Sequence, residues 1–333
     1  MTENKKLTQG AGETATESGT QKRSGLMIHR TAAVIVTYNR CTMLEQCIQA
    51  LRQQTAPCDI LIVDNCSTDA TAGFAATLNE PSIRYRRLDQ NIGGAGGFNA
   101  GMRWAVEEGY SFVWLMDDDC LPKPDALAEL LAADKVLEGD YGFLCSSVLW
   151  TDGKECRMNR QKISKKCYEH IEKMRDALIS VEQSTFVSLF LRREMILKAG
   201  LPLKEFFIWG DDIEYTRRLS VRMGQSCFLA GKSIVTHAMK QNSGSDITID
   251  VPERLSRYKL AYRNENYLYR KEGVKGWIYY NCRCAYHFLK VLLKAKDHRL
   301  KRLWTIFSSY FRGYFFNPQV EYVNDAPRES TNA

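Results

Sequence analysis

The sequence predicts an α/β fold, in which a mostly parallel sheet is flanked by helices, followed by a helical and basic C-terminal extension. Strand-like and helix-like segments alternate four times before residue 120, which is typical of parallel sheets. Polar motifs follow these strands, at the edge where open α/β sheets bind ligands. The chain has 333 residues, 44% of them apolar, which is enough for a large core. No apolar run approaches the roughly 18 residues of a membrane-spanning helix.

Three strands of the first half are short, continuous apolar runs, as buried parallel strands are, and a further strand fits Ser82–Arg86. Helical patterns follow through Leu44–Leu51 and Met102–Val106, the second after a glycine-rich segment. The predicted strands are Ala32–Val36, Ile60–Val63, Ser82–Arg86 and Phe112–Met116.

The second half is less regular, with a strand predicted over Phe186–Leu191 and a polar loop over Gln241–Asp250. From Pro252 onward the pattern is helical and basic. These changes predict a disordered tail over 1–28, a catalytic domain over 29–250, a helical region over 251–320 and a tail over 321–333.

Composition restricts the compartment and the metal chemistry. The N-terminal segment is polar and has no apolar stretch of the kind found in signal peptides, so we expect a cytoplasmic protein. Eleven cysteines without an export signal are then reduced thiols rather than a disulfide framework. Cys282 and Cys284 are too closely spaced for a zinc site and have no second pair.

The strongest local motif is the acidic triplet Asp117-Asp118-Asp119 after the fourth strand. In an extended segment alternate side chains share a face, so Asp117 and Asp119 should point together and Asp118 away. Two carboxylates at this spacing suit a hard divalent cation that keeps positions open for phosphate oxygens. The alternative is a solvated acidic turn in which Asp119 caps the next helix.

A second acidic pair, Asp211 and Asp212, follows the bulky run Phe206–Trp209 and Gly210. A carboxylate at the mouth of an apolar pocket could act as general base for an acceptor hydroxyl. The same pair could instead provide the first-turn charges of a helix. His237 follows a strand-like segment and could complete a metal shell, although one histidine can also be structural.

These motifs together resemble the family 2 inverting glycosyltransferases of the GT-A fold, over about Thr31 to His237. The matching segments are V-I-V-T-Y-N-R (34–40), I-V-D-N-C-S-T-D (62–69), the D-x-D of 117–119 and G-D-D (210–212). The segment N-I-G-G-A-G-G-F (91–98) looks like the galactofuranosyl- and rhamnosyltransferase branch. The stretch W-G-D-D-I-E-Y (209–215) and His237 look most like galactofuranosyltransferases, although there the tryptophan directly precedes the acidic pair, whereas here Gly210 intervenes.

The resemblance implies a role for each matching residue. Asp117 and Asp119 would hold Mn²⁺ or Mg²⁺, with His237 as a further ligand. Asp212 would be the catalytic base, supported by Asp211, and Trp209 would form an acceptor wall. Asp64 would hydrogen-bond the pyrimidine base. The nucleotide-sugar donor would be bound by Thr37, Tyr38, Arg40, Asp64, Asn91, Gly93, Gly94, Asp117 and Asp118.

The C-terminal segment carries the positive charge of the chain. Between Lys271 and Arg312 there are ten lysine or arginine residues and two acidic ones. Apolar residues recur there at helical spacing, which predicts amphipathic helices suited to an anionic membrane interface. Alternatively these faces pack on the catalytic domain or on a second subunit. No motif supports nucleic-acid binding. The apolar positions are Ile278, Cys282, Ala285, Leu289, Leu292, Leu300, Leu303, Trp304, Phe307, Phe311 and Tyr314.

The resemblance therefore predicts transfer of a sugar from a UDP- or dTDP-linked donor, and galactofuranose is the favoured sugar. The acceptor would be a glycan, with a polyprenyl-diphosphate-linked glycan of bacterial surface polysaccharide synthesis favoured. The enzyme would lie on the inner face of the cell membrane, and a homo-oligomer stays open. One alternative is a rhamnosyltransferase using dTDP-rhamnose. Another is a nucleotidyltransferase, which would require a glycine-rich loop directly after the first strand, where Thr37-Tyr38-Asn39-Arg40 has no glycine. A non-catalytic scaffold is the third.

Overall fold

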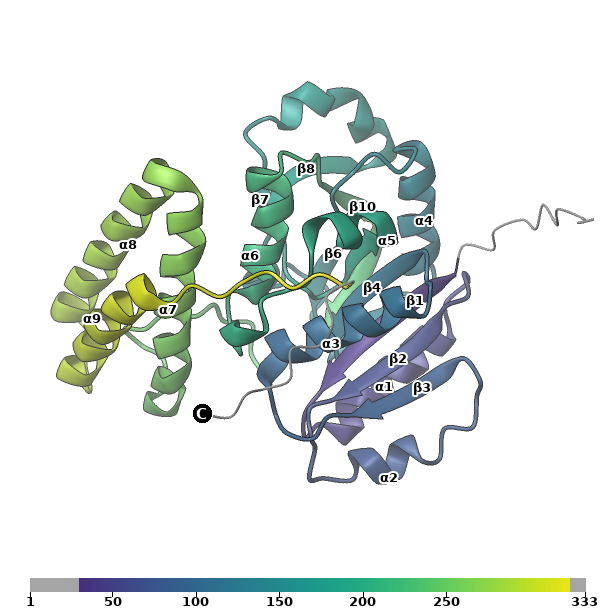
Figure 1. The fold of residues 1–333 in the computed structure, drawn as a ribbon, viewed down its shortest axis with the longest axis horizontal. Helices are drawn as coiled ribbons and strands as arrows, with labels where there is room; N and C mark the ends of the chain where they lie inside the picture. The colour runs from purple at the N-terminus through teal and green to yellow at the C-terminus, as the bar shows by residue number, and fades with distance from the viewer. Residues whose placement is uncertain (1–29, 324–333) are drawn as a thin grey trace, which may run out of the picture.

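The computed structural model describes residues 30–323. The predicted tail over 1–28 and residues 324–333 lie outside this range. A single mixed sheet of ten strands crosses the N-terminal part, in the order β3-β2-β1-β4-β9-β6-β10-β8-β7, with β5 paired to β10 (Figure 1). The strands are β1 (Thr31–Thr37), β2 (Asp59–Asp64), β3 (Ile83–Arg87), β4 (Phe112–Asp117), β5 (Cys120–Pro122), β6 (Leu144–Trp150), β7 (Lys162–Ile163), β8 (Leu178–Gln183), β9 (Leu189–Arg192) and β10 (Phe228–His237).

Strands β1 to β4 are mutually parallel, and β6 runs parallel to β10. Strand β9 is antiparallel to both β4 and β6 and joins the two parallel sets. The carboxyl ends of β1 and β4 therefore lie at the same edge, with Val36 opposite Asp117. The predicted α/β class with a mostly parallel sheet and a helical C-terminal region is confirmed.

Helices cover both faces of the sheet and bury two separate apolar cores. Helices α1 (Cys41–Arg52), α2 (Thr71–Ala75) and α4 (Ala126–Val136) pack on one face. Helices α3 (Gly93–Glu107), α5 (Arg193–Ala199) and α6 (Asp211–Arg217) pack on the other. Because both faces are covered, β1 is buried along its whole length, which explains its uninterrupted apolar run.

The strand predicted over Phe186–Leu191 begins later than expected. Strand β9 starts at Leu189, because Ser188 has a φ of 63°. A left-handed residue breaks the extended conformation, so Phe186 and Val187 lie outside the strand. Phe186 instead lines the large cavity described below.

Three helices follow the sheet and form a bundle beside it (Figure 1). They are α7 (Leu255–Lys271), α8 (Gly273–Lys294) and α9 (Arg299–Phe315), and they share a core of their own. After α9 the chain runs back to the sheet-bearing part (Figure 1, yellow), where the Leu201 amide donates to the Glu321 carbonyl at 2.8 Å. Glu321, where the sequence predicts a tail to begin, also forms ion pairs with Lys204 and Arg103.

Within residues 30–323, no helix combines the length and the apolar character needed to cross a membrane.

Helix α3 lies close against β1 because glycines face the sheet. A Cβ at Gly101 would lie 2.4 Å from Cγ1 of Val34 and 3.1 Å from Cγ2 of Val63, whereas one at Gly94 would meet no atom within 4 Å. We therefore expect Gly101→Ala to lower the free energy of unfolding by about 1–3 kcal/mol through overpacking. Gly94→Ala, the control, should leave it unchanged or slightly raised. Urea denaturation of both variants checks this, and equal shifts would contradict the packing argument.

Candidate active site

The acidic triplet lies at the carboxyl end of β4, where three chain segments meet. Asp117 ends β4, and Asp119 directly precedes β5. Strand β5 pairs antiparallel with β10, with Cys120 opposite His237, and the Ala238 amide donates to the Asp119 carbonyl at 2.8 Å. This pairing sets His237 beside the triplet, although the two are more than 100 residues apart in the chain.

Asp117, Asp119 and His237 offer ligand atoms that all lie within 4.8 Å of one another. Two carboxylates and an imidazole form a donor set that suits a divalent ion such as Mn²⁺ or Mg²⁺. The remaining member of the triplet, Asp118, turns to other partners. Its Oδ2 accepts from Oγ1 of Thr37 at 2.7 Å, and its Oδ1 pairs with Arg40 at 2.9 Å. These residues therefore fit a bound divalent metal ion.

Burial sets the protonation of these groups. Burial and the neighbouring Asp119 raise the pKa of Asp117 to about 6, and burial raises the pKa of Asp118 to about 7. Burial also acts on Asp119, but the hydrogen bond from His237 and the charge of Arg40 outweigh it and lower its pKa to about 2. Arg40 bridges Asp118 and Asp119 and thus neutralises part of this charge.

Asn159 fixes the orientation of His237, and sequence reasoning did not identify it. The amide Nδ2 of Asn159 donates to Oγ1 of Thr185 at 2.8 Å, and its Oδ1 lies 2.7 Å from Nδ1 of His237. With Nδ1–H donating to that oxygen, Nε2 lies 3.0 Å from Oδ1 of Asp119 and donates to it when the ring is protonated, because the nearby carboxylates raise the pKa of His237 to about 10 despite its burial. A metal ion bound at Nε2 would take the place of that proton. A partner such as Asn159 commonly sets the tautomer of a ligating histidine. No motif around Asn159 marks it in the sequence.

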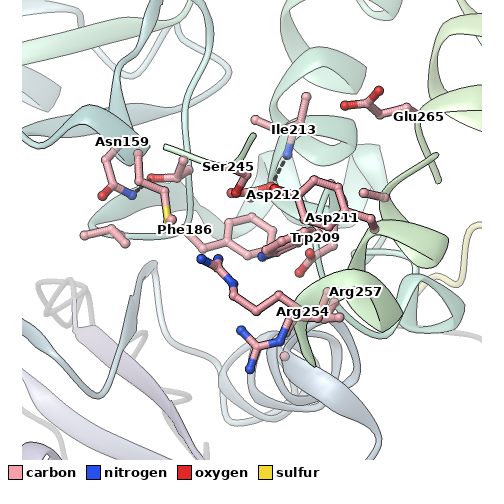
Figure 2. A pocket seen from close by; sticks show the side chains of 18 of the residues that line it. Asn159, Phe186, Trp209, Asp211, Asp212, Ile213, Ser245, Arg254, Arg257 and Glu265 are labelled. Atoms are coloured by element: carbon pink, nitrogen blue, oxygen red, sulfur yellow. Dashed lines mark hydrogen bonds between the residues drawn. The ribbon is translucent and has the colours of Figure 1, made fainter. Parts of the chain in front are cut away.

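The second acidic pair begins α6. Gly210 is the residue before the helix, with a φ of 91°, and Asp211 and Asp212 form its first turn. Both also line a cavity of about 900 Å³ that contains Asp117, Asp119 and His237 (Figure 2). The helix-start and active-site interpretations of the pair are therefore compatible. Burial, together with the neighbouring carboxylate, raises the pKa of Asp211, and burial raises that of Asp212 to about 7.

The loop before α6 is held by the C-terminal bundle. Phe207 and Trp209 both have positive φ angles, 64° and 65°, a conformation that costs free energy in residues other than glycine. The fully buried Asn264 of α7 donates through Nδ2 to the carbonyls of Phe206 at 3.0 Å and Trp209 at 2.8 Å. Trp209, predicted as an acceptor wall, lines the cavity and packs edge-on against Tyr258.

Other predicted donor-binding residues are distributed around this edge. Arg40 and Gly94 line the cavity, whereas Thr37 is buried and Tyr38 is 42% exposed outside it. Asn91 is exposed, and its Oδ1 accepts from the Gly93 amide at 2.8 Å.

Gly93 lies against the Phe207 carbonyl, where a Cβ would come within 2.0 Å. Asp64 is fully buried: its Oδ1 accepts from the Ser67 amide and its Oδ2 from the Tyr85 hydroxyl. In this structure Asp64 therefore does not reach the cavity, and its contact with a base stays a prediction.

Comparison with known proteins agrees with this arrangement. Residues 32–196 match the family described as glycosyl transferase family 2. The galactofuranosyltransferase GlfT1 of Mycolicibacterium smegmatis is 27% identical over 256 residues, covering 73% of this chain and 84% of the relative. The chain belongs to glycosyltransferase family 2. An undecaprenyl-phosphate mannosyltransferase of Micrococcus luteus is 35% identical over 108 residues, covering 31% of this chain and 44% of the relative.

Solved glycosyltransferase structures share the fold of this family 2 chain. The structure of S. aureus TarS 1-349 in complex with UDP-GlcNAc has a TM-score of 0.58 at 13% identity, covering 85% of this chain and 81% of that one. GalNAc-T7 with UDP, GalNAc and Mn²⁺ also gives 0.58 at 13% identity, covering 83% of this chain and about half, 53%, of that one. The fold is thus GT-A, in agreement with the family that residues 32–196 match.

The contact between Asn159 and His237 gives a first test of the metal site. We expect Asn159→Ala to weaken Mn²⁺ affinity by about 10- to 100-fold, because the imidazole loses the group that fixes its tautomer and ring orientation. Calorimetric titration of Mn²⁺ measures the effect. Asn281→Ala on α8, outside the cavity, is the control and should bind as the wild type does. Unchanged affinity in Asn159→Ala would show that Asn159 does not support a metal ligand.

Proposed function

We propose that this chain is an inverting glycosyltransferase that transfers galactofuranose from UDP-galactofuranose to a glycan acceptor. Transfer from dTDP-rhamnose is the alternative. The observation that carries the proposal is that the Asp117–Asp119–His237 cluster and the Asp211–Asp212 pair line one cavity. The named activity of GlfT1 supports the sugar. The nucleotidyltransferase alternative loses its basis, because the matched family and the relatives are glycosyltransferases.

In the proposed reaction each acidic group has one task. An ion held by Asp117, Asp119 and His237, Mn²⁺ or Mg²⁺, would neutralise the departing nucleoside diphosphate. Asp212 would take the proton from the acceptor hydroxyl as that oxygen attacks the anomeric carbon, in a single displacement with inversion. Asp212 is more accessible than the buried Asp211, so it is the better candidate for contact with the acceptor. Asp211 would support it as a neighbouring carboxylate.

Replacement of the base tests the reaction. We expect Asp212→Asn to lower turnover by about 10²- to 10⁴-fold, the usual contribution of a general base, while UDP affinity stays unchanged. Turnover is measured with UDP-galactofuranose and dTDP-rhamnose, with and without Mn²⁺. Asp140→Asn, an exposed aspartate outside the cavity, is the matched control. Wild-type turnover in Asp212→Asn would refute the assignment of the base, and turnover of dTDP-rhamnose alone would refute the assignment of the sugar.

The raised pKa of Asp212 predicts how activity depends on pH. A general base works when ionised, and burial raises the pKa of Asp212 to about 7. The kcat/KM of the wild type should therefore be low below about pH 7 and increase as the pH is raised through that value. The residual rate of Asp212→Asn should lack this limb. An acidic limb that persists unchanged in Asp212→Asn would show that another group controls it.

We further propose that the enzyme works at the cytoplasmic face of the cell membrane on a lipid-linked acceptor. The outer face of α8 and α9 supports this, because its apolar side chains point to solvent while Arg302, Thr305 and Ser309 of α9 are buried. Lysine and arginine residues flank this face, as in helices that lie in an anionic interface. The most exposed members are Val274, Tyr286, Leu293, Leu300, Trp304 and Phe315.

Vesicle binding tests the membrane face. The wild type should sediment with vesicles containing phosphatidylglycerol and bind weakly to pure phosphatidylcholine. The double variant Trp304→Ser/Phe315→Ser should partition about 10- to 100-fold more weakly, because two exposed apolar side chains are lost. Tyr168→Ser, which removes an exposed aromatic residue far from this face, is the control. If the double variant partitions as the wild type does but has a smaller molecular mass in solution, the face is a subunit interface and not a membrane face.

A further inference from the structure

The part of the cavity formed by the C-terminal bundle and by the segment between β10 and α7 carries positive charge, in contrast to the carboxylates around Asp117. Five basic side chains line it and are called the cationic wall here. Arg254 and Arg257 belong to the first turns leading into α7, and in Figure 2 they extend into the cavity on the side of Trp209. The five residues are Lys240, Arg254, Arg257, Arg283 and Lys290.

Three members of the cationic wall have carboxylate partners and two have none. Arg254 pairs with Asp250 at 3.2 Å, Arg283 with Glu265 at 3.1 Å and Lys290 with Asp246 at 2.6 Å. Among residues 30–323, Lys240 and Arg257 have no acidic side chain within ion-pair distance. Both are exposed and line the cavity, so no carboxylate among residues 30–323 neutralises their charge.

The wall also holds an unused hydrogen-bond donor. Nε of Arg254 is buried and meets no acceptor within the described part of the chain. Arg254 is held over the ring of Trp209, at 5.4 Å from its centroid, while its Nη1 pairs with Asp250. Buried polar groups without a partner are rare in folded proteins. An anion bound at the wall would supply acceptors for such donors.

His287 lines the same cavity, between Arg283 and Lys290 of the wall on α8. Burial and the nearby Arg283 and Lys290 lower the pKa of His287 to about 4, so its imidazole is neutral at physiological pH. The Tyr262 hydroxyl lies 2.8 Å from its Nδ1. The positive charge of Arg283 and Lys290, which acts on His287 in the same direction as its burial, also favours a negatively charged ligand.

We propose that Lys240 and Arg257, with Arg254, form a subsite for a phosphoryl group carried by the acceptor. The inference rests on the proposed function, because it takes the carboxylates and His237 for the metal and the donor diphosphate and leaves the cationic wall for the acceptor. Arginine and lysine are the residues that recognise phosphate in proteins. With its phosphate at the wall, an acceptor would be held with its sugar towards Asp212.

The neighbouring surface of α8 indicates which acceptors fit. Arg283 and Lys290 of the wall and the neighbouring His287 recur at intervals of four and three, so they share one face of α8. Tyr286, Leu289 and Leu293 form an adjacent stripe on the same helix and are 60%, 54% and 75% exposed. A phosphate at the wall could therefore carry an apolar chain that continues along this stripe, as an isoprenyl phosphate does.

Binding of farnesyl monophosphate to the full chain tests the subsite, with saturating UDP and Mg²⁺ occupying the donor end. We expect the double variant Lys240→Gln/Arg257→Gln to raise its Kd about tenfold or more and to leave the Kd for UDP unchanged. Lys232→Gln/Lys259→Gln, which removes two exposed lysines outside the cavity, is the matched control and should bind as the wild type does. Farnesol and inorganic phosphate are titrated in parallel.

The outcomes separate the subsite from the proposed function. Weaker binding of farnesyl monophosphate in the double variant alone supports the subsite. In that case, inorganic phosphate binding as tightly as the farnesyl ester shows that the phosphoryl group by itself is recognised. Tighter binding of the ester shows a lipid phosphate. Three results would overturn the subsite. The double variant could bind farnesyl monophosphate as the wild type does, farnesol could bind as tightly as farnesyl monophosphate, or the double variant could lose affinity for UDP. Failure of the wild type to bind UDP would count against the proposed function itself.

Discussion

The site is organised by the need to bury several carboxylates together at the end of one central strand. Asp118 and Asp119 are 2% and 3% exposed, and charges so removed from water require compensation. Arg40, from the turn after β1, pairs with both, and His237, from the end of β10, hydrogen-bonds Asp119. The two flanking elements are therefore held at the strand end by the charge that they neutralise. A divalent ion would add to this compensation.

The C-terminal bundle completes the active site rather than lying apart from it. Asn264 fixes the loop that carries Trp209 into α6. The buried Arg302 of α9 donates to the carbonyls of Ile247 and Asp250, and Lys290 of α8 pairs with Asp246. These contacts order the polar loop after His237, which forms one side of the cavity. Catalytic carboxylates and bundle helices thus share one cavity, so the bundle can determine which acceptor approaches the base.

The bundle has an apolar core, but α9 also carries a row of apolar side chains on its exposed side. Helix α9 buries a polar face against α7 and α8 and presents Trp304, Phe307 and Phe311 to solvent. Hydrogen bonds add to the apolar contacts inside the bundle, as where Nδ2 of Asn266 donates to the Tyr310 carbonyl at 3.0 Å. This arrangement leaves the apolar faces free for an external surface. Two residues of the cationic wall, Arg283 and Lys290, then lie beside the apolar stripe on α8.

Local sequence determined the elements whose signal is contained in a few neighbouring residues. Strands β1, β2 and β4 follow from continuous apolar runs, because a strand buried on both faces needs no polar alternation. The acidic motifs and the amphipathic periods of the bundle were equally readable. The sequence misplaced the start of β9, because the left-handed conformation of Ser188 leaves no compositional mark. Strands β5, β6, β7 and β8 were not predicted either.

The tertiary structure decided which distant residues meet. The antiparallel pairing of β5 with β10 brings Asp119 to His237, and Asn159 reaches that histidine from a loop with no motif of its own. The fold also buries Asp64, expected at the base, and gathers Lys240, Arg254 and Arg257 around one cavity. Motifs record the chemistry of single segments. The partners that orient, neutralise and complement them come from long-range packing, which sequence spacing does not encode.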